Sequence, residues 1–133
     1  MKNNTNDDQQ LIIKTENTDF SNVNCPMTNA LDIIGGKWKL LLLNKVREEC
    51  PMRFGVLRKK MPYITQATLT AQLRELERDG IISREAFAES PPRVEYKLTE
   101  IGKSLIPVMD ILCDWGNAYC RMKVSNRKRT SGN

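Results

Sequence analysis

The stretch YITQATLTAQLRELERDGII, residues 63–82, constrains the fold more than any other part of the chain. Leu69, Leu73 and Leu76 recur at helical spacing, which predicts a helix with one face buried in a core. Thr65 is a residue type that caps helix N-termini, and Gly80 is the type that ends helices. Two isoleucines follow the glycine directly, so this helix is predicted to lead straight into a strand.

Two alternating segments follow the helix. IISREAF and RVEYKL alternate apolar and polar residues and are joined by AESPPR, which predicts a β-hairpin with a proline-stiffened tip. Upstream, Pro26 is expected to begin a helix that ends at Gly35 and Gly36, and KWKLLLLNKV and CPMRFGVLRKKMP are expected to supply two more. Short helices followed by a two-stranded hairpin are the order of a winged helix-turn-helix. The predicted fold is therefore mainly α with a small β-hairpin.

The solvent side of the helix in residues 63–82 carries hydroxyls, an amide and an arginine. Such side chains near a helix N-terminus can sit in the major groove of DNA, although a solvated surface explains this helix taken alone equally well. The hairpin favours the groove, because in a winged helix-turn-helix the hairpin touches the adjacent backbone or minor groove. The candidate DNA-binding residues on this helix are Thr65, Gln66, Thr68, Thr70 and Arg74. Arg93 is the candidate at the hairpin tip, where the alternative is an ordinary exposed loop.

The charge of the chain points to an anionic partner. Its 133 residues, 40% of them hydrophobic, suffice for one domain, and the formal net charge is +5 with a pI of about 9.1. Residues 1–24 hold two lysines against four acidic residues, so the basic excess lies in the rest of the chain. We expect a flexible polar arm over residues 1–24, one domain over residues 25–120 and a basic tail over residues 121–133.

The composition argues against an enzyme. The chain has no histidine and no CxxC pair, which removes the Cys/His zinc patterns and histidine-based catalysis, so no metal and no cofactor are expected. A thiol-dependent enzyme built on Cys25 would lack an accompanying base, metal site or phosphate loop. The sequence shows neither a membrane-spanning apolar run nor the apolar core of a signal peptide, so we expect a cytoplasmic protein with reduced thiols and no membrane partner.

Three longer stretches together resemble the HxlR-type bacterial transcriptional regulators, a winged-helix group related to MarR regulators. They are CPMTNALDIIGGKWKLLLL, MRFGVLRKKMPYITQATLTAQLRELERDGII and PPRVEYKLTEIGKSLIPVMDILCDWG. The resemblance covers about residues 25–120, and the order and length of the three stretches make it specific. It implies a homodimer that binds a partly palindromic DNA operator and that either represses or activates transcription.

The C-terminal segment independently predicts a dimerisation helix. After Thr99, a good N-cap, apolar residues recur at alternating spacings of four and three, which form a heptad seam. Pro107 is expected to kink or divide this helix. The alternative is that the helix only folds back on its own domain. The seam residues that we assign to the dimer interface are Leu105, Val108, Leu112, Trp115 and Tyr119.

Basic residues outside the predicted recognition helix are candidates for phosphate contacts. Arg58, Lys59 and Lys60 come just before that helix, and Lys37 is expected to begin an earlier one. Some of these charges are simply solvated. The tail RMKVSNRKRTSGN could add non-specific affinity for DNA, with an inert basic end as the alternative. Trp38 and Phe54 are assigned to the core and not to base stacking.

Cys25 is the candidate redox-sensing residue. A cysteine before a proline at a helix start lies where amide groups and the helix dipole lower the thiol pKa. Some members of the resembled family use a cysteine at this CP position to sense oxidants or electrophiles, whereas in others it has no sensing role, so an inert structural cysteine is the alternative. Cys113 and Cys120 are about 10 Å apart along a helix, too far for a bond within it. Cys50, in a predicted loop, is the reserve candidate.

The function predicted from these features is a homodimeric, sequence-specific DNA-binding regulator of transcription, with Cys25 as a candidate thiol sensor. The expected partners are double-stranded operator DNA, a second copy of the chain and small oxidants or electrophiles. The alternative is a winged-helix module that binds RNA or another protein and has no operator specificity.

Overall fold

The computed structural model describes residues 25–130, with side chains to residue 128. Contacts between backbone segments divide the chain into two units, Met1–Ile33 and Ile34–Asn133. Helix α2 (Pro26–Ile34), which belongs to the first unit except for its last residue, begins at the proline, as predicted, and exposes the apolar side chains of Met27 and Leu31. The predicted arm over residues 1–24 lies outside the described residues.

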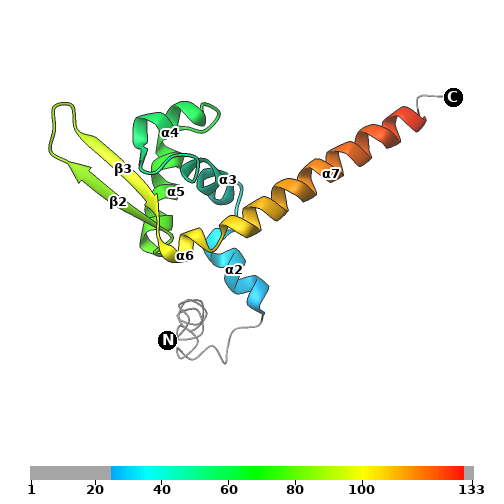
Figure 1. Ribbon diagram of the computed structural model, residues 1–133, viewed down its shortest axis with the longest axis horizontal. Helices are drawn as coiled ribbons and strands as arrows, with labels where there is room; N and C mark the ends of the chain where they lie inside the picture. The colour runs from blue at the N-terminus through cyan, green and yellow to red at the C-terminus, as the bar shows by residue number, and fades with distance from the viewer. Residues whose placement is uncertain (1–24, 131–133) are drawn as a thin grey trace, which may run out of the picture. The chain divides into compact units, whose positions relative to one another are not determined.

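The second unit contains the helices and strands of a winged helix (Figure 1). In chain order they are α3 (Lys39–Val46), β1 (Met52–Arg53), α4 (Phe54–Lys60), α5 (Gln66–Arg78), β2 (Ile82–Phe87), β3 (Arg93–Leu98), α6 (Glu100–Lys103) and α7 (Ile106–Thr130). The predicted order of short helices, hairpin and C-terminal helix is thus confirmed. In the described residues, no helix is long and apolar enough to cross a membrane.

The hairpin forms part of a larger sheet than predicted. Strand β3 pairs on one side with β2 and on the other with β1, all antiparallel, so the order is β1-β3-β2. The two-stranded hairpin is confirmed, and the third strand was not predicted because β1 is two residues long, too short to give an alternating pattern. Its pairing places Met52 opposite Tyr96 and Arg53 opposite Glu95.

The core lies between α3, α4, α5 and the sheet. The three leucines predicted to face inward on α5, Leu69, Leu73 and Leu76, are buried. At about 1.5–3 kcal/mol for each large apolar side chain, this burial is the main force that holds α5 against the rest of the unit. The other fully buried large side chains are Leu42, Leu43, Val46, Met52, Leu57, Met61 and Ile82.

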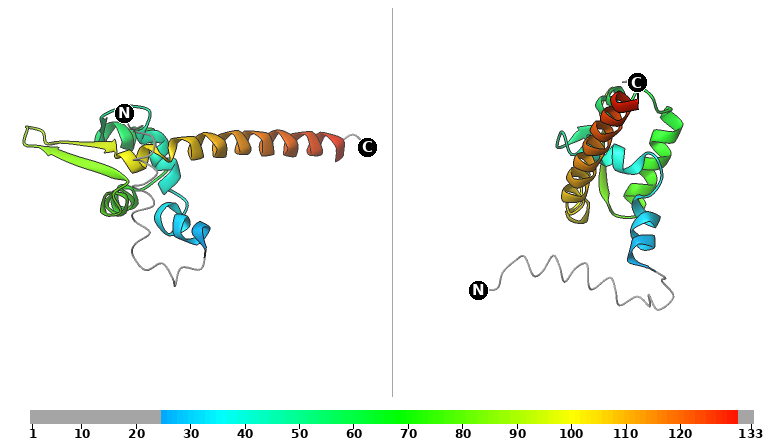
Figure 2. Two further views of the ribbon diagram at one scale, coloured as in Figure 1. Left: turned by 60° about the horizontal axis from the view of Figure 1, so that its bottom comes forward. Right: turned by 90° about the vertical axis from the view of Figure 1, so that its right-hand side faces the viewer.

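The C-terminal helix is divided where the sequence predicted. Thr99 caps α6, which ends at Lys103, and α7 starts at Ile106 with Pro107 in its first turn, where a missing N–H breaks no helical hydrogen bond. Helix α7 then runs without interruption to Thr130 (Figure 2). It therefore includes most of the segment that we had assigned to a basic tail.

One junction joins the end of α5 to the start of α6. The hydroxyl of Thr99 lies 2.6 Å from the Gly80 carbonyl oxygen, and it accepts a hydrogen bond from the Gly102 N–H at 3.2 Å. The Thr99 N–H donates to the Ile81 carbonyl oxygen at 3.1 Å. Gly102 is packed so tightly against this carbonyl group that a Cβ atom there would overlap the Ile81 oxygen.

We predict that Gly102→Ala destabilises the protein by about 1–3 kcal/mol, because the methyl group would collide with backbone atoms that cannot rotate away. Gly55→Ala is the matched control, since the added methyl group at this helical position meets open space and should be neutral or stabilising by up to about 1 kcal/mol. Urea unfolding followed by circular dichroism measures both. Equal midpoints for the two variants would contradict the tight junction.

Candidate nucleic-acid interface

The N-terminus of α5 is fixed by its cap. The Thr65 hydroxyl accepts a hydrogen bond from the Thr68 N–H at 3.2 Å and donates one to the Thr68 hydroxyl at 2.8 Å. The cap is the one predicted, and it stabilises the helix by about 1 kcal/mol. It also engages both of these threonine side chains in the free protein. Beyond the cap, Gln66 and Arg74 are exposed and Thr70 is half-buried.

The exposed surface of α5 is narrower than its helical periodicity suggested. Thr68, a candidate on the solvent side, is half-buried, and so is Glu75. Glu75 lies 3.8 Å from the ammonium nitrogen of Lys39, a side chain with only 7% of the residue exposed, and it accepts a hydrogen bond from Gln72. The C-terminal half of α5 is thus held toward α3 by charge, which apolar periodicity does not reveal.

A cleft of about 400 Å³ lies between α5 and the hairpin. Arg74 and Thr70 enter it from α5, and Arg84 enters it from β2. Neither arginine forms an ion pair with the residues that the structure describes. The remaining lining residues are Phe54, Glu77, Val94 and Tyr96. Sequence reasoning missed Arg84, whose place in the alternation of β2 could have identified it.

Arg93 is bound within the hairpin and does not project from its tip. Its guanidinium lies 3.2 Å from a Glu89 carboxylate oxygen and 3.4 Å from one of Glu95, and its central carbon is 4.1 Å from the centre of the Phe87 ring. Arg53 of β1 approaches the same Glu95 oxygen at 3.9 Å. This set of residues, which we call the hairpin charge cluster, contains two arginines and two glutamates.

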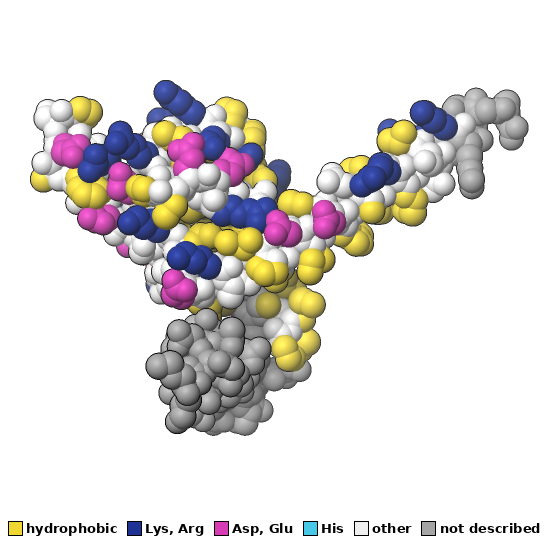
Figure 3. Space-filling view, viewed as in Figure 1, with side chains coloured by type: hydrophobic (Ala, Val, Ile, Leu, Met, Phe, Trp, Pro, Cys, Tyr) yellow, Lys and Arg dark blue, Asp and Glu magenta, His cyan; other side chains and the backbone are white. Residues whose placement is uncertain are grey.

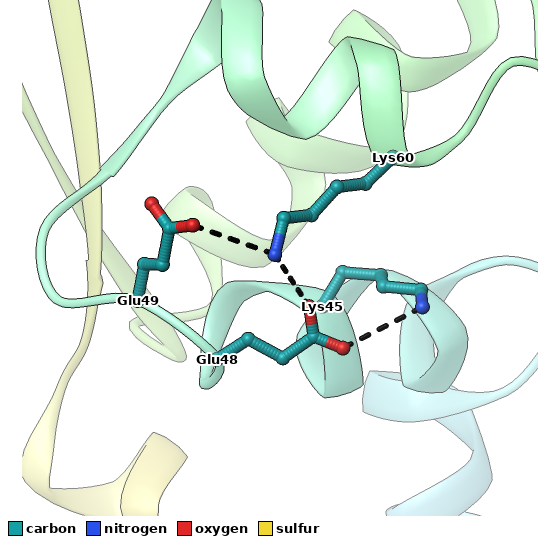
Figure 4. Close-up of polar contacts among 4 residues, drawn as sticks. All are labelled: Lys45, Glu48, Glu49 and Lys60. Carbon is teal, nitrogen blue, oxygen red and sulfur yellow. Dashed lines mark hydrogen bonds and ion pairs between the residues drawn. The ribbon is translucent and has the colours of Figure 1, made fainter.

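Lys60 is also engaged by neighbouring acids. Its ammonium nitrogen lies 2.6 Å from a Glu48 oxygen and 3.5 Å from a Glu49 oxygen, and Glu48 is shared with Lys45 (Figure 4). The hydrogen bond with Glu48 raises the pKa of Lys60, and the same bond lowers the pKa of Glu48. A phosphate contact by Lys60 would have to compete with these carboxylates.

The other basic candidates are exposed. Arg58 and Lys59 point outward from α4, and Lys59 lines a second groove of about 560 Å³ beside the hairpin tip. Lys37 precedes α3 and does not begin it, because the helix starts at Lys39. The Lys37 ammonium group lies 4.7 Å from the centre of the Trp38 ring. Trp38 stacks on Tyr63 but is only half-buried, as is Phe54, so neither is among the buried core residues to which both were assigned.

Helix α7 presents an unpartnered apolar surface. Trp115 is 64% exposed, Leu112 45% and Val108 40%, and Trp115 stacks on Tyr119 with ring centres 5.3 Å apart. Yellow apolar side chains are visible along α7 in Figure 3. Met109 differs from these, because it is buried. Leu105 is half-buried at the start of the seam.

Cys25 is exposed and lies immediately before α2. Hydrogen bonds from the backbone N–H groups of Thr28 and then Met27 lower the pKa of its thiol, because they stabilise the negatively charged thiolate. The thiols of Cys50, Cys113 and Cys120 are also exposed. Within the described residues, no cluster of three or more Cys, Asp or Glu side chains could hold a metal ion.

Comparison with known proteins identifies the family. Residues 33–124 match the family model described as HxlR-like helix-turn-helix. The chain belongs to this family. Relatives of the chain are HTH-type transcriptional regulators, and the chain is a regulator of transcription with a helix-turn-helix domain and not an enzyme.

Three relatives illustrate the HxlR-like similarity. The HTH-type transcriptional regulator YdeP of Bacillus subtilis is 54% identical over 95 residues, which cover 71% of this chain and 73% of the relative. An HTH-type regulator of Methanothermobacter thermautotrophicus is 50% identical over 71% of this chain and 72% of its own length. The redox regulator HypR in its reduced form is 44% identical, with a TM-score of 0.69 over 76% of this chain and 99% of HypR.

Proposed function

We propose that this chain is a homodimeric, sequence-specific DNA-binding regulator in which the chemical state of Cys25 sets operator affinity. The observation that carries the DNA-binding part is the capped N-terminus of α5 with Arg74 exposed and without an ion pair among the described residues. A guanidinium on the solvent side of such a helix has the reach and the donor geometry to contact a guanine edge in the major groove.

The remaining groups divide into base contacts and phosphate contacts. Gln66, Thr70 and Arg74 are our candidates for reading bases, with Thr65 and Thr68 acting as the cap that aims them. The phosphate candidates are the exposed cations Lys37, Arg58 and Lys59, and then Lys60 where phosphate displaces its carboxylate partners. Phosphate contacts of this kind fix orientation and add affinity that falls with salt concentration.

The apolar surface of α7 supports a homodimer. Val108, Leu112, Trp115 and Tyr119 are each at least 40% exposed and follow one heptad seam. Apolar side chains in such numbers on one helix face indicate a binding surface. In a two-fold dimer the surface would cover itself, and two α5 helices would meet half-sites about one DNA turn, roughly 34 Å, apart.

The position of Cys25 supports a thiol sensor. The thiol is exposed, and the backbone N–H groups at the start of α2 lower its pKa, so more of it is the nucleophilic thiolate at neutral pH. With a quinone, the thiolate sulfur would add to a ring carbon while solvent supplies the proton for the adduct. HypR, a relative of known structure, is a redox regulator whose oxidized and reduced forms have both been solved.

Arg74→Ala should weaken operator binding by about 1–3 kcal/mol and relax base preference at one position, because it removes a base contact. Arg78→Ala is the matched control, since Arg78 is on the last turn of α5, already pairs with Asp79, and should change binding by less than about 0.5 kcal/mol. Footprinting on the region upstream of its own gene supplies the operator, and titration of the duplex gives the affinities. Normal binding by Arg74→Ala would mean that another face of α5 reads the DNA.

Leu112→Glu should convert a dimer into a folded monomer at micromolar concentration, because two buried carboxylates cannot face each other in an apolar seam. Asn117→Glu places the same charge on the opposite side of α7 and should leave the dimer intact. Sedimentation velocity distinguishes the two. A wild-type monomer that still protects a full palindrome would refute the dimer.

Cys25 should be alkylated faster than the other thiols at every pH below the ordinary thiol pKa of about 8.5. The lowered pKa keeps the Cys25 thiolate present as pH falls, so its alkylation rate should decline only at a lower pH than the rate of an ordinary free thiol. Mass spectrometry after iodoacetamide pulses gives the alkylation rate of each cysteine.

Release of operator DNA on treatment with a quinone should disappear in Cys25→Ser and persist in Cys50→Ser. A normal response of Cys25→Ser would mean that another thiol is the sensor.

A further inference from the structure

The two arginines of the hairpin lie on opposite faces of it. Strand register places Arg84 opposite Tyr96 and Arg93 opposite Phe87, and neighbouring cross-strand pairs point to alternate faces of a sheet. The face with Arg84 borders the cleft that also contains Arg74 of α5. The face with Arg93 contains the hairpin charge cluster. The same residue type therefore occupies two different electrostatic environments on one hairpin.

The face with Arg93 offers little attraction to a phosphate. The hairpin charge cluster contains two arginines and two glutamates, so its formal charges cancel. Glu85, which is opposite Glu95 in register, adds a further negative charge on that face. Contact with a phosphate would require Arg93 to leave Glu89, Glu95 and the Phe87 ring, all within 4.1 Å of its guanidinium.

The face with Arg84 lies where a DNA strand has to pass. When α5 occupies the major groove and the hairpin reaches the adjacent minor groove, the sugar-phosphate backbone that separates the two grooves crosses the space between them. In this chain that space is the cleft lined by Arg74, Arg84 and Thr70, together with Phe54, Val94 and Tyr96. Glu77 is the one acidic residue of the lining, which leaves a net positive charge in the cleft.

We propose that Arg84 is the phosphate contact of the hairpin and that Arg93 is a positioning residue, which holds the hairpin so that Arg84 faces the DNA backbone. The inference rests on the proposed DNA-binding function and assigns the wing contact to a residue that the sequence did not single out. A guanidinium is suited to the task because it can donate two parallel hydrogen bonds to one phosphate.

The test uses the salt dependence of binding to a mixed-sequence duplex, which needs no operator. Each phosphate that a cation neutralises contributes about 0.9 to the slope of log affinity against log salt concentration. Arg84→Gln should lower the slope by that amount, and Arg84→Lys should restore most of it. The double variant Arg93→Gln/Glu89→Gln, which removes one charge of each sign, should lower the slope by less than Arg84→Gln does, because Arg84 is still present but is no longer held toward the phosphate.

Coupling between the two arginines tests the positioning role. If Arg93 acts by aiming Arg84, then Arg84→Gln should lower the slope less in the Arg93→Gln/Glu89→Gln background than in the wild type, whereas a general loss of stability would leave that effect unchanged. An unchanged slope in Arg84→Gln, or independent effects in the combined variant, would overturn the inference while the wild type still binds DNA. A wild type without salt-dependent duplex binding would instead overturn the proposed function.

Discussion

The hydrogen bonds of Thr99 hold together the parts of the molecule on which its function depends. Its hydroxyl and amide groups donate hydrogen bonds to the carbonyl groups of Gly80 and Ile81, in the turn between α5 and β2. Thr99 itself lies between the end of β3 and the start of α6, where its hydroxyl accepts a hydrogen bond from Gly102. The helix that we propose reads DNA, both strands of the hairpin and the start of the C-terminal helices therefore meet at one point. Gly102 is needed at this junction because only a residue without a side chain fits beside the Ile81 carbonyl group.

The distribution of acidic residues decides which cations remain available to a partner. Composition gives a basic protein, but Lys39, Lys60 and Arg93 each face a carboxylate of the same chain. Arg74 and Arg84 line the two sides of one cleft, and neither forms an ion pair with a carboxylate among the described residues. Paired cations position helices and strands. Unpaired cations can neutralise phosphates of DNA and so release the counterions bound there.

Much of the fold could be predicted from the spacing of apolar residues and from the residues that cap and end helices. The spacing of Leu69, Leu73 and Leu76, with Thr65 and Gly80 at the ends, predicted α5, and alternation predicted the hairpin. Strand β1 could not be predicted because pairing across the chain, and not local pattern, creates a two-residue strand. The site was predictable only in part. Helical periodicity placed Arg74 at the surface. The ion pair of Glu75 depends on Lys39 of another helix, and those of Arg93 depend on how the folded hairpin brings Glu89 and Glu95 beside it, so the sequence assigned Arg93 to an exposed tip.

The same junction anchors the start of the proposed dimer helix to the unit that we propose reads DNA. Thr99 ties α6 to the end of α5, and Arg47 of the turn after α3 forms an ion pair of 2.7 Å with Asp110 in the second turn of α7. The start of α7 is thus held at two places, and all the side chains that the structure describes beyond Asp110 belong to exposed residues. In a dimer built on those side chains, a small rotation where the two α7 helices meet would move both α5 helices as rigid bodies. Because two half-sites must be met at once, such a rotation would change operator affinity without any change within either winged helix.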